Sequence, residues 1–346
     1  MPITLTADKL TAAKDLARIL MPGRRVCLTT HVNPDGDGLG SEVGLVHLLS
    51  GLGVIVTVAN PTRTPPRFEF LFRDLPGVDK SGEAVKEIRR ADALVVLDIS
   101  DLGRLGMLTD AVRERGSTVP VGCVDHHVSP GTLPAGPRYL DPTAAATGEL
   151  IVEIAMANEW SLTKAAARAL YVAILTDTGG FRFSNTHPRT LRIAAELLDR
   201  GIDPEAIYLD VYAGAPEGRV RLLADVLQTL VVEPEVGIAW VTVPPGAIDR
   251  HGVGSDDLDG VVEHARSIAG IRMALLFREI GQGRVKVSLR SVGDVDVAAF
   301  AQPFGGGGHA KASGLSLEGS LAEVQGRVLT EARRFLAPSA TLRTRN

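Results

Sequence analysis

Short apolar runs that end in acidic or imidazole side chains constrain this fold more than any other feature of the sequence. The run at residues 121–124 leads into Asp125, His126 and His127. Comparable runs lead to His31, Asp98 and Asp177. Burying acids and imidazoles at strand ends costs free energy unless they have partners. In open α/β sheets, ligands bind outside the carboxyl ends of the strands. We therefore expect a single site, with a divalent metal as the partner.

Strand-like runs alternate with helical patterns through the first half of the chain. Strands that alternate with helices form parallel sheets with helices on both faces. The pattern therefore predicts an α/β fold with a doubly wound, mostly parallel sheet. The predicted strands occupy residues 24–31, 54–58, 93–98 and 119–125, and the predicted helices occupy residues 7–20, 42–52, 83–90, 104–115, 147–158 and 164–175.

Chain length and a change of pattern after His187 predict two domains. Single cores stop growing at roughly 250 to 300 residues, whereas this chain has 346. Helical segments follow His187 up to a break at residues 214–216, and strand patterns resume beyond it. We expect a first domain at residues 1–200, a helical linker at 201–228, a second, smaller mixed α/β domain at 229–338 across a cleft, and a basic tail at 339–346.

Composition limits the partners of the protein. A net charge of -4 and an aromatic content of 4% argue against long duplex DNA and against an extended base-stacking track. Any nucleic-acid substrate should be short. Cys27 and Cys123 fall in apolar strand patterns, which favours small buried side chains in a reducing compartment. We find no signal-like N-terminus and no run of about 18 apolar residues, so we expect a cytoplasmic protein with no membrane partner.

The donor types favour a hard divalent cation. An oxygen-rich set with a few imidazoles suits Mn²⁺ and, less well, Mg²⁺, and the lack of thiolates disfavours structural zinc. Asp35 and Asp37 alternate in a glycine-containing turn that can bend close to an ion. Each residue also has an ordinary alternative. Asp35 and Asp37 can be turn formers, Asp98 a strand-end cap, Asp177 a helix-terminal acid and His126 a core histidine. Their joint occurrence at strand ends favours the metal.

The order of these clusters, together with the glycine run Phe304-Gly305-Gly306-Gly307-Gly308-His309, resembles the DHH phosphoesterase superfamily and its DHH-associated C-terminal domain. The resemblance covers nearly the whole chain and is greatest to the short oligoribonuclease and pAp phosphatase group. It implies two cations, Mn²⁺ in the first place and Mg²⁺ as the alternative, which activate a hydroxide for attack on phosphorus. One cation would be bound by His31, Asp35, Asp98 and Asp177, and the other by Asp37, Asp98, His126 and Asp177.

The resemblance also implies roles beyond metal binding. His127 would lie near the scissile phosphate and assist departure of the leaving oxygen, Asp98 would be the second catalytic residue, and Asp125 would orient an imidazole. The substrate would be bound by Arg290, Gly307, Gly308 and His309, and the position of Arg104 just after Asp98 adds it as a further phosphate-binding candidate. A surface salt bridge is the alternative for Arg104, and a flexible linker or a packed loop is the alternative for the glycine run. Relatives carry a Ser where this chain has Ala146, so a phosphate contact at that helix start would rest on Thr147 and backbone amides.

The expected function is metal-dependent hydrolysis of short oligoribonucleotides, of 3′-phosphoadenosine 5′-phosphate (pAp), or of both, with pApA and cyclic dinucleotides as further substrates of the family. A manganese inorganic pyrophosphatase would share the N-terminal clusters, but its C-terminal lobe should present basic residues instead of GGGGH. A catalytically inactive nucleotide-binding protein is the third alternative, and the retention of so many mutually repelling carboxylates argues against it. The resemblance also implies a homodimer.

Overall fold

The computed structural model describes residues 4–128, 131–214 and 216–337. The chain divides into two compact units, Met1–Gly214 and Ala215–Asn346. The division runs through the predicted linker at 201–228, because helix α8 (Pro204–Tyr212) belongs to the first unit and helix α9 (Glu217–Leu227) to the second. The predicted tail at 339–346 lies outside the described residues.

A wholly parallel five-stranded sheet forms the centre of the first unit. Its strands lie in the order β2 (Ile55–Val58), β1 (Arg25–Thr29), β3 (Ala93–Leu97), β4 (Val121–Asp125) and β5 (Arg138–Leu140). Strand β2 lies on one side of β1 in the sheet, and β3 lies on the other side. The carboxyl ends of β1 and β3 therefore form a topological switch point, which is where ligands bind in sheets of this kind.

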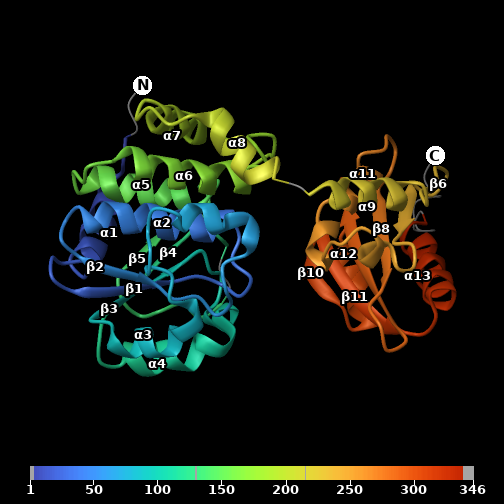
Figure 1. Cartoon of the computed structure of the whole chain (residues 1–346), viewed down its shortest axis with the longest axis horizontal. Coiled ribbons are helices and arrows are strands. Elements are labelled where there is room, and N and C mark those ends of the chain that lie inside the picture. The colour runs from blue at the N-terminus through green and yellow to red at the C-terminus, as the bar shows by residue number, and fades with distance from the viewer. Residues whose placement is uncertain (1–3, 129–130, 215, 338–346) are drawn as a thin grey trace, which may run out of the picture. The chain divides into compact units, whose positions relative to one another are not determined.

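Helices cover both faces of this sheet (Figure 1). Alternate residues of β3 point to opposite faces, so Val95 and Leu97 join one apolar core while Leu94 and Val96 join the other. On the first face α1 (Ala7–Ala17), α2 (Gly36–Ser50) and α5 (Thr147–Ala157) lie against the sheet, α6 (Lys164–Asp177) packs on α2 and α5, and α7 (Pro188–Leu198) packs on α6 and α5. The second face is covered by α3 (Ala84–Arg90), the 3₁₀ helix η3 (Leu102–Leu108) and α4 (Thr109–Gly116). Two further 3₁₀ helices are η1 (Pro66–Phe72) and η2 (Ser81–Glu83).

The second unit contains a mixed six-stranded sheet in which only β7 and β8 are parallel neighbours. Its order is β10 (Gly307–His309), β11 (Ala312–Glu318), β9 (Arg284–Ser291), β8 (Met273–Glu279), β7 (Ile238–Thr242) and β6 (Val231–Glu233). Helices α12 (Val297–Ala301) and α13 (Leu321–Leu336) pack in one core, and α9, α10 (Ala247–Arg250) and α11 (Val261–Arg266) in the other. The 3₁₀ helices η4 (Ser255–Leu258) and η5 (Gln302–Phe304) complete this unit.

The predicted fold class is confirmed, because a doubly wound parallel sheet is followed by a smaller mixed α/β unit. Within the described part of the chain, no helix combines the length and the apolar character that crossing a lipid bilayer would require.

Candidate metal centre

The carboxyl ends of β1 and β3 bring His31 and Asp98 together. Each residue follows its strand closely, and His31 Nε2 lies 3.5 Å from Asp98 Oδ2. Asp98 adopts a left-handed backbone conformation with φ 57°, which is uncommon outside glycine and tends to occur at functional sites. Its backbone N–H donates to Val124 O of the neighbouring strand β4 at 3.0 Å. Both side chains are buried, so the switch point holds an acid and an imidazole in contact.

Asp35 and Asp37 lie at the start of α2. Asp35 is the N-cap, and its Oδ1 accepts hydrogen bonds from the backbone N–H groups of Asp37 at 3.0 Å and Gly38 at 3.2 Å. Its Oδ2 lies 3.7 Å from His31 Nε2. Asp37 begins the first turn and is 2% exposed. The α2 cap therefore orients one carboxylate toward His31 and places the other in the interior.

The N-terminus of α5 binds Asp37. Thr147 N donates to Asp37 Oδ2 at 2.7 Å, and Gly148 N donates to Asp37 Oδ1 at 3.0 Å. The Thr147 hydroxyl donates to Asp98 Oδ1 at 3.1 Å. The prediction that these two amides bind phosphate is therefore wrong, because the carboxylate of Asp37 already occupies the anion-binding end of the helix.

Each of two imidazoles presents one nitrogen to the carboxylates and the other to the backbone. His31 Nδ1 lies 2.9 Å from Val32 O, and His126 Nδ1 lies 3.3 Å from Ala144 O. A backbone acceptor at Nδ1 fixes the orientation of the ring and leaves Nε2 for a metal. His126 Nε2 lies 3.5 to 3.7 Å from one oxygen of each of three carboxylates, Asp98, Asp37 and Asp177.

These spacings fit the donor set of a divalent cation. Donor atoms that lie about 2.1 Å from a shared cation in octahedral geometry are about 3.0 Å apart when adjacent and about 4.2 Å apart when opposite. The spacings of 3.5 to 3.7 Å lie between these values. Among the described residues, three groups offer ligand atoms within 4.8 Å of one another. The groups are His31, Asp35 and Asp98; Asp37, His126 and Asp177; and Asp98, His126 and His127. The first two match three of the four ligands predicted for each cation, and Asp98 lies beside both. Whether the predicted sets bind cations stays a prediction.

The pKa values reflect a concentration of negative charge. Burial raises the pKa of Asp177 to about 6, with a further contribution from Asp98, and burial and Asp98 also raise the pKa of Asp37. Burial favours neutral imidazoles, yet the adjacent carboxylates raise the pKa values of His31 and His126 to about 10. Burial likewise disfavours the Asp98 carboxylate, but the two imidazoles bring its pKa below the usual range. Such a cluster favours positive charge, which imidazolium protons or bound cations can supply.

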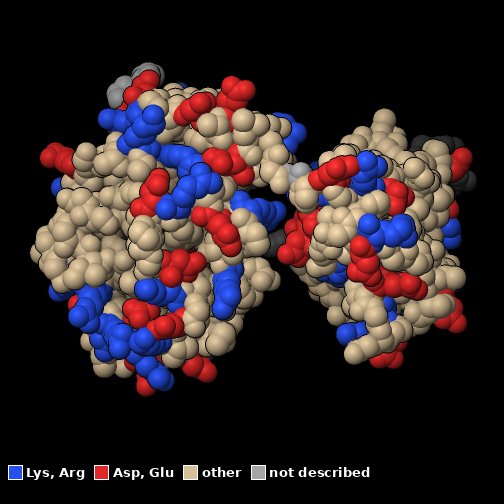
Figure 2. All heavy atoms as spheres, in the orientation of Figure 1, with Lys and Arg blue, Asp and Glu red and all other residues tan. Residues whose placement is uncertain are grey.

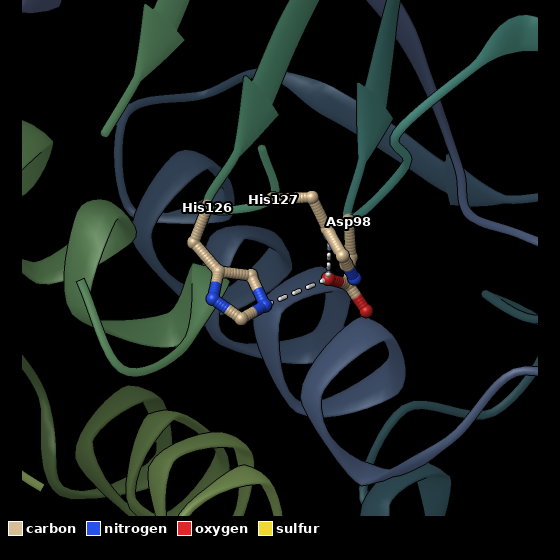
Figure 3. A group of neighbouring side chains, drawn as sticks. All are labelled: Asp98, His126 and His127. Atoms are coloured by element: carbon tan, nitrogen blue, oxygen red, sulfur yellow. Dashed lines mark ion pairs between the residues drawn. The ribbon is translucent and has the colours of Figure 1, made fainter. Parts of the chain in front are cut away.

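His127 lies beside His126, with ring centroids 4.5 Å apart, and both rings face Oδ1 of Asp98 (Figure 3). Its Nδ1 is 2.8 Å from Asp125 Oδ1 and 3.6 Å from Asp98 Oδ1. Its side chain is 29% exposed, whereas that of Asp125 is fully buried. Asp125 therefore holds an accessible imidazole next to Asp98, which is the arrangement required to place a proton donor at a substrate oxygen.

The predicted substrate-binding residues are distributed over both units. Arg104 follows β3 in η3; its carbonyl accepts from Val32 N at 2.9 Å, and its side chain forms no hydrogen bond or ion pair with the described residues. Arg290 of β9 donates from Nε to Glu263 Oε1 at 2.8 Å. Gly307 and Gly308 pair with Gly314 and Ser313 in the second sheet. The backbone of His309 belongs to β10, but its side chain lies outside the described residues. The role of all five residues stays a prediction.

Two residues that support the centre were not predicted from the sequence. Asn185 donates from Nδ2 to Ala145 O and to Asp177 O, each at 3.1 Å, and so ties the end of α6 to the start of α5. Asn60 accepts from Thr30 N at 2.9 Å and donates to the buried Glu42 at 2.8 Å. The acid of Glu42 within an apolar helix was a usable signal for this second link. A polar loop residue such as Asn185 gives no comparable signal.

Comparisons with known proteins agree with this geometry. Residues 25–174 match the model of the DHH family, N-terminal domain, and residues 235–337 match the DHHA1 domain. The chain is 33% identical to the bifunctional oligoribonuclease and PAP phosphatase NrnA of Thermus thermophilus, over 92% of each chain. It is 27% identical to the protein of the same name from Bacillus subtilis, over 88% of this chain and 92% of that one.

A solved structure supports the same assignment. The crystal structure of an exopolyphosphatase-related protein from Bacteroides fragilis superposes with a TM-score of 0.86 at 27% identity, covering 97% of this chain and all of that one. The predicted resemblance is thus confirmed by sequence and by fold. The chain belongs to the DHH family, with an N-terminal DHH domain and a C-terminal DHHA1 domain, and is related to the NrnA proteins.

Proposed function

We propose that this protein is a metal-dependent phosphoesterase that hydrolyses short oligoribonucleotides, pAp, or both, with pApA and cyclic dinucleotides as further candidate substrates. The observation that carries this function is the contact of Asp98 with three imidazoles, those of His31, His126 and His127. Each of these imidazoles also faces a further carboxylate, and that of His127 is the most accessible of the three. The names of the relatives, oligoribonuclease and PAP phosphatase, support phosphoester bonds of nucleotides as the target.

The donor set supports two divalent cations, with Mn²⁺ as the first candidate and Mg²⁺ as the second. We assign His31, Asp35, Asp98 and Asp177 to one cation and Asp37, Asp98, His126 and Asp177 to the other. When bound, such a pair lowers the pKa of a water molecule and neutralises charge on the phosphate oxygens. The α5 amides and the Thr147 hydroxyl keep Asp37 and Asp98 in place, so the protein supplies a preorganised set of ligands.

His127 acts on the substrate in this assignment. Its Nδ1 is held by Asp125, so the accessible Nε2 can hydrogen-bond to the phosphate and donate a proton to the leaving oxygen. Asp98 is the other proposed catalytic residue, because it contacts all three imidazoles and is assigned to both cations. Arg104 in the first unit, and Arg290, Gly307, Gly308 and His309 in the second, are proposed to bind phosphate or nucleotide groups of the substrate.

Surface charge supports short substrates. Figure 2 shows basic and acidic side chains interspersed over the visible face of the first unit. The net charge of the chain is -4. Long nucleic acids are bound through many phosphate contacts from a basic surface, whereas a nucleotide or dinucleotide needs only a few cationic groups. We also propose a cytoplasmic location and a homodimer. Light scattering on the purified protein would test the homodimer.

One panel of assays tests the proposed function. The purified protein with Mn²⁺ is given pyrophosphate, pAp, a dinucleotide RNA, pApA and c-di-AMP, and Asp98→Ala serves as the control. We expect phosphate or mononucleotide release from at least one nucleotide substrate and its loss in Asp98→Ala. Hydrolysis of pyrophosphate alone would instead identify an inorganic pyrophosphatase. No turnover of any substrate would favour a nucleotide-binding protein without catalysis.

A further inference from the structure

The loop that follows Asp177 has an unusual backbone. Gly179, Gly180 and Phe181 have φ values of 57°, 71° and 64° in succession. Thr178 holds this turn, because its carbonyl accepts from Arg182 N and Phe183 N at 3.0 Å and its hydroxyl accepts from Phe181 N at 3.0 Å. Glycine adopts a positive φ readily, but Phe181 in this conformation is strained and persists only where surrounding contacts fix it. The loop is thus a defined structure directly beside a candidate metal ligand.

The loop also returns to its starting point. Asn185 donates from Nδ2 to the carbonyl of Asp177 at 3.1 Å, and Arg182 donates from Nε to Gly179 O at 2.7 Å. These contacts close residues 177–185 into a compact turn. Every side chain on the turn therefore stays close to the end of α6.

The side chain of Phe183 is presented by this turn. A Cβ atom added at Gly179 would overlap the Phe183 ring, so the ring lies directly on the Gly179 backbone. Phe183 is nevertheless 52% exposed. A large apolar ring that is backed by the protein and open to solvent gives a flat surface on which another ring can stack.

Further aromatic side chains lie at the same end of α6. Among the described residues, only four Phe, Tyr or Trp side chains are exposed to solvent, namely Phe183, Tyr208, Tyr212 and Phe335. Tyr212 Oη donates to Leu175 O at 3.4 Å, two residues before Asp177, and the rings of Tyr208 and Tyr212 are 5.1 Å apart. Burial raises the pKa of Tyr212, and the nearby charge of Arg182 opposes that rise. Exposed rings and a cation thus gather in a chain that is poor in aromatic residues.

We propose that Phe183 is a stacking platform for a nucleobase of the substrate, with Tyr212 and Arg182 beside it. Aromatic rings interleaved with basic groups are typical of surfaces that bind single-stranded nucleic acid, because every base offers a π-face. A nucleotide with its base stacked on Phe183 would have its phosphate near Asp177. This assignment rests on the proposed function, and it names the base as the group that distinguishes nucleotides from pyrophosphate.

Hydrolysis of pApA and of the same dinucleotide lacking both bases tests this role. In Phe183→Leu we expect KM for pApA to rise about tenfold, equivalent to about 1.4 kcal/mol, with kcat within about twofold of the wild type because Leu keeps an apolar group on Gly179. KM for the base-free compound should not change. Phe183→Tyr, which keeps the ring, should retain the wild-type KM.

Matched variants separate stacking from folding. Phe335→Leu makes the same change at an exposed phenylalanine of the second unit and should leave both KM values unchanged. If Phe183→Leu melts well below the wild type, Tyr212→Leu against Tyr212→Phe provides the same comparison at the neighbouring ring. An unchanged KM for pApA, or an equal loss for the base-free compound, would overturn the stacking role. A wild-type enzyme that hydrolyses no nucleotide substrate of the assay panel would overturn the proposed function as well.

Discussion

The Nδ1 atom of His127 lies 2.8 Å from Oδ1 of Asp125. Asp125 is buried at the end of β4, and its second oxygen has no hydrogen-bond partner among the described residues. A carboxylate in this position fixes the tautomer and the orientation of an imidazole. Asp125 therefore contacts one ring nitrogen of His127, whereas His126 presents its Nε2 to three carboxylates. Two consecutive histidines thus have different environments.

Substitution of His127 should impair turnover without loss of metal. In His127→Ala we expect kcat to fall by about 10²- to 10⁴-fold, which is the usual contribution of a positioned proton donor. Metal content, measured by atomic emission after dialysis, should stay near the wild type. His126→Ala is the control and should lose metal. Loss of metal from His127→Ala would show that His127 is a ligand.

Asp125→Asn should reproduce part of this defect. The amide keeps the size of the side chain but cannot stabilise a charged imidazole, so we expect kcat to fall by about 10- to 100-fold. The decisive measurement is kcat together with metal content, which should stay near the wild type because Asp125 contacts His127. An unchanged kcat would contradict the orienting role of Asp125.

Cation affinity should rise with pH. The pKa values of His31 and His126 are about 10 and that of Asp177 is about 6, so protons compete with a cation at neutral pH. Release of one proton per bound cation makes the affinity rise about tenfold for each pH unit. Calorimetric titration of the chelator-treated protein with Mn²⁺ at pH 6.5 and 8, in two buffers of different ionisation enthalpy, measures both effects. Equal affinity at the two pH values would contradict this expectation.

Glu42→Gln should stabilise the metal-free protein at alkaline pH. Burial raises the pKa of Glu42 from 4.5 to about 8, so the folded state keeps a proton that the unfolded state releases. Between these two pH values stability falls as pH rises, and the loss is fully present above the folded pKa. Gln stays neutral and can still accept from Asn60. We expect a gain of about 1 to 4 kcal/mol at pH 8.5 and little change at pH 5, measured by urea unfolding with EDTA. An equal effect at both pH values would point to packing instead.

Gly40→Ala should separate α2 from α6. A Cβ at Gly40 would lie 2.6 Å from Ala169 O and 2.9 Å from Ala173 N, both in the backbone of α6. We expect a loss of about 1 to 3 kcal/mol in unfolding free energy. Mn²⁺ binding should also weaken, because α2 carries Asp37 and α6 ends at Asp177.

Gly51→Ala is the matched control for this change. Gly51 has φ -62°, and its added Cβ would make only an ordinary contact at 3.5 Å with Leu48 O. Its stability and metal binding should stay near the wild type. If Gly40→Ala behaved like Gly51→Ala, close helix packing would not be what positions the two acids.

Much of the architecture was predictable because it follows from local pattern. The apolar run before Asp98 and the one before Asp125 are β3 and β4, which lie side by side in the sheet. Acids and imidazoles at their ends had to meet at one edge because parallel strands share the direction of their carboxyl ends. The alternation of strands and helices was sufficient to predict the doubly wound fold. The support from Asn185 and the closure of the loop after Asp177 could not be derived in this way.

The amino-acid sequence by itself determined which residues could form a metal centre and where along the chain they occur, because apolar periodicity and strand ends are local properties. Only the tertiary structure decided how those residues are held. The α5 amides that bind Asp37 are 110 and 111 positions away from it in the chain, and no local pattern records such a contact. The left-handed turn at Asp98 and the exposed ring of Phe183 likewise depend on neighbours that folding brings together, because packing alone selects one conformation among those a residue can adopt.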